Sequence, residues 1–198
     1  MRQQKFFLLT ILIVIIDQAV KLLVHYHMTM GPGGEISLLG DWFKLHYILN
    51  KGMAFGLSFG SAYGKLFLTL FRLVAIAFII IGLQRLRLKN YHPGLLWCIA
   101  GILGGAIGNL IDSIFYGVLF DNAPYNSITP WFHGQVIDML YFDVWEGYVA
   151  DWVPFWGGKK IALWPIFNIA DAAIFCSVLL IVIFQNRFLK TSNSYRLN

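Results

Sequence analysis

The sequence predicts an all-α membrane protein with four transmembrane helices, a small extracytoplasmic β-sheet and a second outward loop segment. Its 198 residues are 58% hydrophobic and only 13% charged, with a mean hydropathy of +0.66, whereas soluble domains carry about 25% charged residues. Four apolar runs approach the roughly 20 residues that a bilayer-spanning helix requires. We expect residues 1–190 to form a single membrane-embedded domain and residues 191–198 to form a polar tail.

The composition also argues against several functions. The net charge of +5 fits basic cytoplasmic loops better than nucleic-acid binding, because no basic run is long enough to form a binding patch. Both cysteines, Cys98 and Cys176, lie in apolar runs and no CxxC motif is present, so thiol redox chemistry and a zinc ribbon lack support. Tryptophan gathers outside the apolar runs, as in the aromatic belt at a membrane surface: Trp131, Trp145, Trp152, Trp156 and Trp164.

The first span is predicted over residues 6–27, and we interpret it as retained because no small-residue cleavage site follows it. Asp17 and Lys21 interrupt it at i,i+4 spacing, which places them on one helix face. An ion pair there would ease the burial of both charges. A structural role for this pair is the simpler interpretation, and a direct catalytic role is the other.

The first outward segment is predicted over residues 28–65. Gly31-Pro32-Gly33-Gly34 breaks any helix. Residues 42–49 are aromatic and β-branched with partial alternation, which predicts a strand. Residues 50–56 resemble a turn back towards the membrane. A small antiparallel sheet on the bilayer surface fits this pattern, and a plain interfacial loop is the alternative.

The second span is predicted over residues 66–86, with Arg72 inside it. Basic residues gather at both chain ends and after this span: Arg2, Lys5, Arg85, Arg87, Lys89, Arg187, Lys190 and Arg196. The positive-inside rule therefore places both termini and the middle loop in the cytoplasm. The topology is N-in and C-in, and the two outward segments face the other side.

The third span is predicted over residues 95–115 and the fourth over residues 165–188, with residues 116–164 forming the second outward segment. In the third span, the pairs Gly101/Gly105 and Gly104/Gly108 have the small-xxx-small spacing that permits close helix packing.

Polar residues from four places along the chain are predicted to meet at one depth, in the outer leaflet. Asn109 and Asp112 lie near the outer end of the third span, and Asn168 and Asp171 lie in the first turns of the fourth. The outward segments add Asn50 and Asp138. Since carboxylates inside a membrane are costly, they usually face a cavity or a partner.

Asp138 and Asp171 would form a dyad if they lie a few ångströms apart. Two such carboxylates share one proton and titrate as a unit. The ionised member can activate water while the protonated one polarises a carbonyl, as in aspartic peptidases. Spacing alone leaves three interpretations open: this dyad, a proton or cation pathway, and structural polar contacts.

Five stretches together carry a family resemblance, and they occur in the same order as in that family. They are Asp17-Gln18 with Lys21, Asn50-Lys51-Gly52-Met53-Ala54-Phe55-Gly56, Gly108-Asn109-Leu110-Ile111-Asp112, Gly134-Gln135-Val136-Ile137-Asp138 and Phe167-Asn168-Ile169-Ala170-Asp171. In this order and topology they resemble the bacterial lipoprotein signal peptidases (signal peptidase II). The resemblance covers most of the chain except the tail and much of residues 116–164.

The resemblance implies an intramembrane aspartic endopeptidase of the bacterial inner membrane, with its active site towards the outer leaflet. Such enzymes cut signal peptides from prolipoproteins before a diacylglyceryl-modified cysteine. It implies Asp138 and Asp171 as the catalytic pair. The residues that would line or support the site are Asn50, Asn109, Asn168, Asp17, Lys21, Gly108, Asp112 and Ala170. We expect a monomer in contact with membrane lipids, with a lipid-modified prolipoprotein as substrate and with no metal, organic cofactor or nucleic acid.

The sequence departs from the family pattern in two places. Ser113 follows Asp112 where the family usually carries Arg, so whatever that Arg holds in place would have to be held otherwise, or by Lys51 or another residue of the outward segments. The segment around Asp138 is also longer than the family pattern needs. Its part from residue 141 to residue 164 could form a lid, a surface-binding element or an inert insertion.

Three other functions are alternatives to an aspartic peptidase. A proton-coupled transporter would need polar access from both leaflets and fits poorly with acids confined to one. A serine–lysine peptidase would need Ser113, Ser127 or Ser177 beside a lysine, but Lys21 is the only lysine predicted inside a span and no serine shares that span. A structural membrane protein would carry the same polar residues without any activity.

Overall fold

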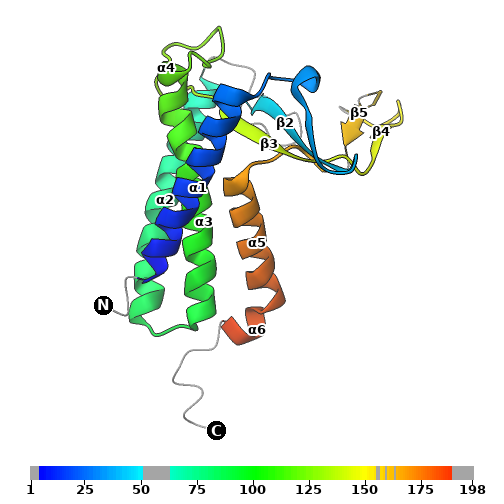
Figure 1. Cartoon of the computed structure of the whole chain (residues 1–198). Helices are drawn as coiled ribbons and strands as arrows, with labels where there is room; N and C mark the ends of the chain where they lie inside the picture. The colour runs from blue at the N-terminus through cyan, green and yellow to red at the C-terminus, as the bar shows by residue number, and fades with distance from the viewer. Residues whose placement is uncertain (1–4, 51–62, 155–156, 159, 163, 189–198) are drawn as a thin grey trace. The chain divides into compact units, whose positions relative to one another are not determined.

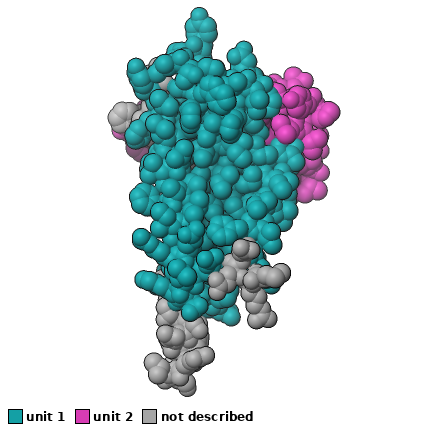
Figure 2. Space-filling view, turned by 90° about the vertical axis from the view of Figure 1, so that its left-hand side faces the viewer, with its two compact units in different colours: residues 1–20, 49–136, 169–198 teal, residues 21–48, 137–168 magenta. Residues whose placement is uncertain are grey.

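The computed structural model describes residues 5–50, 63–154, 157–158, 160–162 and 164–188. The chain forms two compact units, which Figure 2 shows in teal and magenta. Unit 1 consists of residues 1–20, 49–136 and 169–198, and unit 2 of residues 21–48 and 137–168. The expected single domain of residues 1–190 stays a prediction.

Helices dominate unit 1 (Figure 1). Helix α1 (Lys5–His27) contributes its first part to unit 1. The other helical elements of unit 1 are α2 (Gly64–Leu88), α3 (Pro93–Ile111), the π-helical segment η2 (Asp112–Tyr116), α4 (Gly117–Leu119), α5 (Ile169–Ile183) and α6 (Gln185–Phe188).

Three helical stretches are long and apolar enough to cross a membrane in the part of the chain that the structure describes: Lys5–His27, Gly64–Leu88 and Pro93–Leu119. Their bounds agree with those of the first three predicted spans to within a few residues. The fourth, predicted over residues 165–188, has a shorter helix, because α5 begins only at Ile169 and ends at Ile183. Its 15 residues extend roughly 22 Å at about 1.5 Å per residue. The count of four spans and the N-in, C-in orientation stay predictions.

Helix α3 packs against both α2 and α5. Between α2 and α3, a buried apolar cluster contains Ile76, Leu83, Leu96 and Leu103. The Thr10 hydroxyl of α1 donates to the Ala100 carbonyl at 2.9 Å, so α1 also lies against α3. This packing explains why the glycines of the third span matter.

The two predicted small-residue pairs of α3 face different neighbours. A Cβ atom added at Gly105 would lie 2.3 Å from the Ala170 carbonyl oxygen of α5, and one at Gly101 would lie 2.3 Å from the Ser177 hydroxyl. A Cβ atom at Gly104 would lie 2.9 Å from the Ile13 side chain of α1. The close packing predicted from the glycine spacing is therefore confirmed.

Unit 2 contains most of a three-stranded sheet with the order β1-β2-β3. Strand β1 (Ile36–Leu39) pairs antiparallel with β2 (Phe43–Asn50), with Ile36 opposite Leu45. The strand predicted over residues 42–49 is thus confirmed with a shift of one residue. The turn predicted after Asn50 falls on residues 51–56, which lie outside the described residues.

The second outward segment is not only loop, which corrects the sequence prediction. It contains β3 (Val136–Phe142) and an antiparallel pair, β4 (Glu146–Tyr148) and β5 (Lys160–Ala162). The first four residues of β3 are all buried. Successive side chains of a strand point to opposite faces, so both faces of β3 are covered there. A strand covered on both faces is a near-continuous apolar run without alternation, so its periodicity did not identify it.

Candidate active site

Three of the predicted support residues, Asp17 among them, meet inside unit 1. The Asp17 side chain is completely buried, and its Oδ1 accepts a hydrogen bond from the main-chain N–H of Ala170 at 2.9 Å. A Cβ atom at Gly108 would lie 2.6 Å from Asp17 Oδ2, so a glycine is needed where α3 passes this carboxylate. Asp17, Gly108 and Ala170 therefore meet, as the resemblance implied.

Gln18 extends this group towards Asp112. Its Nε2 donates to Asp112 Oδ1 at 2.8 Å and to the Gly108 carbonyl at 3.2 Å. Its Oε1 accepts from the Tyr116 hydroxyl at 2.9 Å. Because Gln18 uses both its donor and its acceptor, the amide is fixed in one orientation. Sequence reasoning gave no role to Gln18 or Tyr116.

The two candidate catalytic acids each accept a hydrogen bond from an asparagine amide. In unit 1, Asn109 Nδ2 donates to Asp171 Oδ1 at 2.7 Å. In unit 2, Asn168 Nδ2 donates to Asp138 Oδ1 at 2.6 Å, and both of these side chains are completely buried. A buried acid held by a short hydrogen bond has a defined orientation.

The backbone explains why Asn168 reaches Asp138. The N–H of Leu140 donates to the Phe167 carbonyl at 2.8 Å, and the N–H of Phe167 donates back to the Leu140 carbonyl at 3.0 Å. This bridge holds the residues just before α5 against β3. Asn168 follows Phe167 directly, so its amide is placed beside the strand that carries Asp138.

Two further predicted residues, Lys21 and Asn50, belong to α1 and β2. Lys21 is completely buried, and Asn50 ends β2 in a half-buried position. Asp138 belongs to unit 2 and Asp171 to unit 1, so their pairing as a dyad stays a prediction. Within the described residues, no group of three or more His, Cys, Asp or Glu side chains could hold a metal ion.

Ser113, the departure from the family pattern, has two hydrogen-bonded partners. Its hydroxyl is completely buried, accepts from Arg72 Nη1 at 2.7 Å and donates to the Asn109 carbonyl at 2.9 Å. The cation at this position therefore comes from α2. The sequence suggested Lys51, which lies outside the described residues. Arg72 was placed inside the second span but not connected with Ser113, although an arginine within an apolar span was the available signal.

The loop that contains Phe132 and Gly134 supports η2. The N–H of Gly134 donates to the Ser113 carbonyl at 3.0 Å, and the N–H of Phe132 donates to the Ile114 carbonyl at 3.2 Å. The Thr69 hydroxyl of α2 donates in turn to the Phe132 carbonyl at 2.8 Å. π-Helical turns within α-helices often occur at functional sites, and this one follows directly after Asn109 and Asp112.

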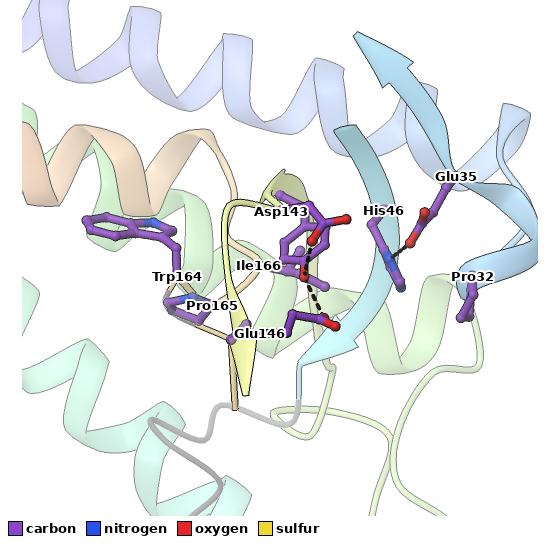
Figure 3. A pocket seen from close by; sticks show the side chains of 10 residues that line it. Pro32, Glu35, His46, Asp143, Glu146, Trp164, Pro165 and Ile166 are labelled. Carbon is purple, nitrogen blue, oxygen red and sulfur yellow. Dashed lines mark hydrogen bonds and ion pairs between the residues drawn. The ribbon is translucent and has the colours of Figure 1, made fainter. Parts of the chain in front are cut away.

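A separate cavity of about 420 Å³ lies within unit 2 (Figure 3). Its lining includes Glu35, His46, Tyr141, Asp143, Glu146 and Trp164. Tyr141 and Asp138 are three residues apart on β3, so their side chains point to opposite faces of the strand. The cavity therefore does not open onto the Asp138 carboxylate.

Hydrogen bonds tie the polar residues near this cavity together. Lys44 Nζ lies 2.6 Å from Asp143 Oδ2, and this hydrogen bond raises the pKa of Lys44 above its ordinary value. The Tyr141 hydroxyl donates to Glu146 Oε1 at 2.7 Å. Burial, and then this hydrogen bond, raise the pKa of the Tyr141 phenol. Both shifts favour the protonated side chains at neutral pH.

The chain shares its fold with solved bacterial membrane enzymes. One such structure has a TM-score of 0.60 and 23% identity, covering 91% of this chain and 92% of that one. A second has a TM-score of 0.59 and 22% identity, covering 91% and 87%. At this level of identity, the likeness defines the fold alone.

Sequence relatives identify the family. A lipoprotein signal peptidase of Amoebophilus asiaticus is 51% identical, covering 90% of this chain and 76% of the relative. One of Porphyromonas gingivalis is 40% identical, covering 88% and 80%, and one of Chlorobium phaeobacteroides is 35% identical, covering 93% and 98%. The family model described as signal peptidase (SPase) II matches residues 9–187. The chain belongs to the signal peptidase II family, and it is therefore a membrane-bound protease.

Proposed function

We propose that this protein is an aspartic endopeptidase that removes signal peptides from diacylglyceryl-modified prolipoproteins, cutting before the lipid-modified cysteine. Asp138 and Asp171 are the proposed catalytic acids. The observation that carries this assignment is that each acid is oriented by its own amide donor, Asn168 for Asp138 and Asn109 for Asp171. The names of the relatives, lipoprotein signal peptidases, supply the substrate class.

The proposed reaction uses the two acids in opposite protonation states. The ionised carboxylate takes a proton from water as the water oxygen attacks the scissile carbonyl carbon. The protonated acid gives its proton to the carbonyl oxygen, which produces a neutral gem-diol. The first acid then protonates the leaving amine while the second recovers a proton from a diol hydroxyl, and the C–N bond breaks. The pair returns to one shared proton.

The asparagine amides have a defined part in this scheme. An amide that donates to Oδ1 fixes the plane of the carboxyl group and hence the direction of its other oxygen. This orientation affects catalysis, because small displacements of reacting groups lower the rate by large factors. The Asp17 group has a supporting part, because it holds the main chain directly before Asp171.

The proposed setting is the bacterial inner membrane, with the active site towards the outer leaflet. Exposed apolar side chains on α1 and α2, such as Leu8, Phe67 and Phe78, fit contact with lipid. We expect the enzyme to act as a monomer. The scheme requires water and two carboxyl groups, and it includes no step that uses a metal or an organic cofactor.

The proposal is tested with protein purified in detergent and a lipid-modified prolipoprotein, with cleavage followed as a mobility shift. The wild type should cleave. Asp138→Asn and Asp171→Asn are near-isosteric and should stop cleavage at normal levels of folded protein. The double variant should be about as inactive as either single variant, because the two acids act as one unit. A large residual activity in either single variant would refute the assignment, as would inhibition by a serine-directed reagent while both variants remain active.

A further inference from the structure

We propose that Arg72 of α2 is a positioning residue for Asp171, acting through Ser113 and Asn109. This inference rests on the proposed peptidase function, in which Asp171 is a catalytic acid. It assigns a task to a half-buried cation that neither the family resemblance nor the predicted site residues include.

The first support is a series of contacts within unit 1 that reaches the main-chain carbonyl of Asn109 through two hydrogen bonds and continues from the side-chain amide of the same residue to Asp171. Arg72 Nη1 donates to Ser113 Oγ at 2.7 Å, and the Ser113 hydroxyl donates to the Asn109 carbonyl at 2.9 Å. The Asn109 amide then donates to Asp171 Oδ1 at 2.7 Å. The donor and acceptor roles are consistent throughout, since arginine can only donate and a hydroxyl can do both.

The second support is the cost of placing this arginine in α2. An arginine inside a membrane helix is costly to insert, and such residues usually have a function. The neighbouring Phe71, Leu73 and Val74 are 61%, 43% and 51% exposed, so they form an outward apolar surface. Arg72 is less exposed and ends on the completely buried Ser113. If the hydrogen bond to Ser113 only joined α2 to η2, an uncharged donor in place of Arg72 would make the same contact at a lower cost.

The third support is the local geometry of α3 at its outer end. Asn109 lies in the last turn of α3, directly before the π-helical segment η2. The main-chain carbonyl of Asn109 accepts from the Asp112 N–H, and the Ser113 hydroxyl adds a second hydrogen bond to the same oxygen. A hydroxyl that accepts from a guanidinium is polarised and becomes a stronger donor. Arg72 thereby stiffens the turn that aims the Asn109 amide at Asp171.

The proposal requires a positive charge at the contact between Arg72 and Ser113, on either of the two residues. Arg72 and Ser113 meet at the tips of their side chains, so exchanging the two residues would place the guanidinium on η2 and the hydroxyl on α2. The total volume and charge would be unchanged. Arg72→Ser combined with Ser113→Arg should therefore restore much of what each single substitution removes.

The experiment measures kcat and KM per folded molecule, together with the melting temperature, for Arg72→Ser, Ser113→Arg, their combination and Arg72→Lys. The control is Arg85→Ser, which changes an exposed arginine in the last turn of the same helix. We expect Arg72→Ser to lower kcat about tenfold to a hundredfold with little change in KM, because misplaced groups act on the chemical step. Arg72→Lys and the exchange variant should each recover activity, and Arg85→Ser should match the wild type.

Two results would overturn the inference: Arg72→Ser with wild-type kcat, or an exchange variant no more active than the single variants. If Arg72→Ser does not accumulate, Arg72→Gln and Arg72→Lys decide, and equal activity in these two would refute a role for the charge. Asp171→Asn is assayed alongside. An active Asp171→Asn variant refutes the peptidase proposal itself, whereas an inactive one beside unaffected Arg72 variants refutes only the inference on Arg72.

Discussion

Asp17 Oδ1 accepts a hydrogen bond from the main-chain N–H of Ala170 at 2.9 Å, although the two residues are 153 positions apart in the chain. Ala170 is the second residue of α5, where N–H groups have no partner within the helix. A carboxylate from α1 therefore performs the task that a local N-cap residue usually performs. Since Asp171 follows directly, Asp17 also fixes where the candidate catalytic acid begins its helix.

Asp17→Asn should lower stability and activity together. The amide oxygen can still accept from Ala170, but the charge that strengthens this hydrogen bond is lost. We expect a loss of about 1–3 kcal/mol in the free energy of unfolding, the range for a weakened buried polar contact. Thermal unfolding and cleavage measured on the same preparation check this. Lost cleavage with unchanged stability would instead make Asp17 a participant in the chemistry.

The glycine facing α5 offers a second test of how the site is supported. A Cβ atom at Gly105 would lie 2.3 Å from the Ala170 carbonyl oxygen and 2.7 Å from Ile174 Cγ1. Gly105→Ala should therefore displace α5 and cost about 1–3 kcal/mol, with a fall in cleavage. Gly82→Ala in α2 is the matched control, because a Cβ atom there meets nothing within 4 Å. If both variants melt and cleave alike, α3 and α5 do not depend on this close approach.

The sequence predicted the elements whose signal is local. Apolar runs located α1, α2 and α3, and the glycine spacing in α3 predicted close helix packing. The strand β2 was predicted from its aromatic and β-branched residues. In each case, the property that defines the element lies within the element itself.

The sequence did not predict features that depend on partners elsewhere in the chain. Strand β3 has no alternation because both of its faces are buried. Asn109 and Asn168 were expected to orient the acids or bind substrate carbonyls, but which acid each amide contacts, and the contact of Gln18 with Asp112, depend on residues 30 to 94 positions away. Arg72 was recognised as lying inside a span, but its partner Ser113 is 41 positions distant. Periodicity carries no information at that range.

The predicted orientation can be tested at the two ends of one helix. The stretch Pro93–Leu119 is long enough to cross a membrane, and the exposed residues Lys89 and Asn126 lie before and after it. In a Cys98→Ala, Cys176→Ala background, Asn126→Cys should react with an impermeant thiol reagent added outside the cell, and Lys89→Cys should not. The reason is the excess of basic residues on the Lys89 side. Labelling in the opposite sense would place the candidate site in the other leaflet.

The last prediction concerns the two amides that hold the candidate acids. Asn109→Ala and Asn168→Ala should each lower kcat by about tenfold to a hundredfold at near-normal KM, because each leaves a carboxyl group present but free to rotate. Asn122→Ala is the matched control. Asn122 is also buried, and its amide donates to the Gln135 carbonyl at 3.1 Å while its side-chain oxygen accepts from the Gln135 N–H at 3.0 Å.

These three variants remove similar buried hydrogen bonds, so all three should lower the melting temperature. Only the first two should lower kcat per folded molecule, since Asn122 contacts neither acid through these bonds. Equal kcat in all three variants would show that the amides are structural, and a proportionate loss in all three would show that activity follows stability alone. A loss confined to Asn109→Ala and Asn168→Ala would support separate orientation of Asp171 and Asp138, which a water-activating pair of acids requires.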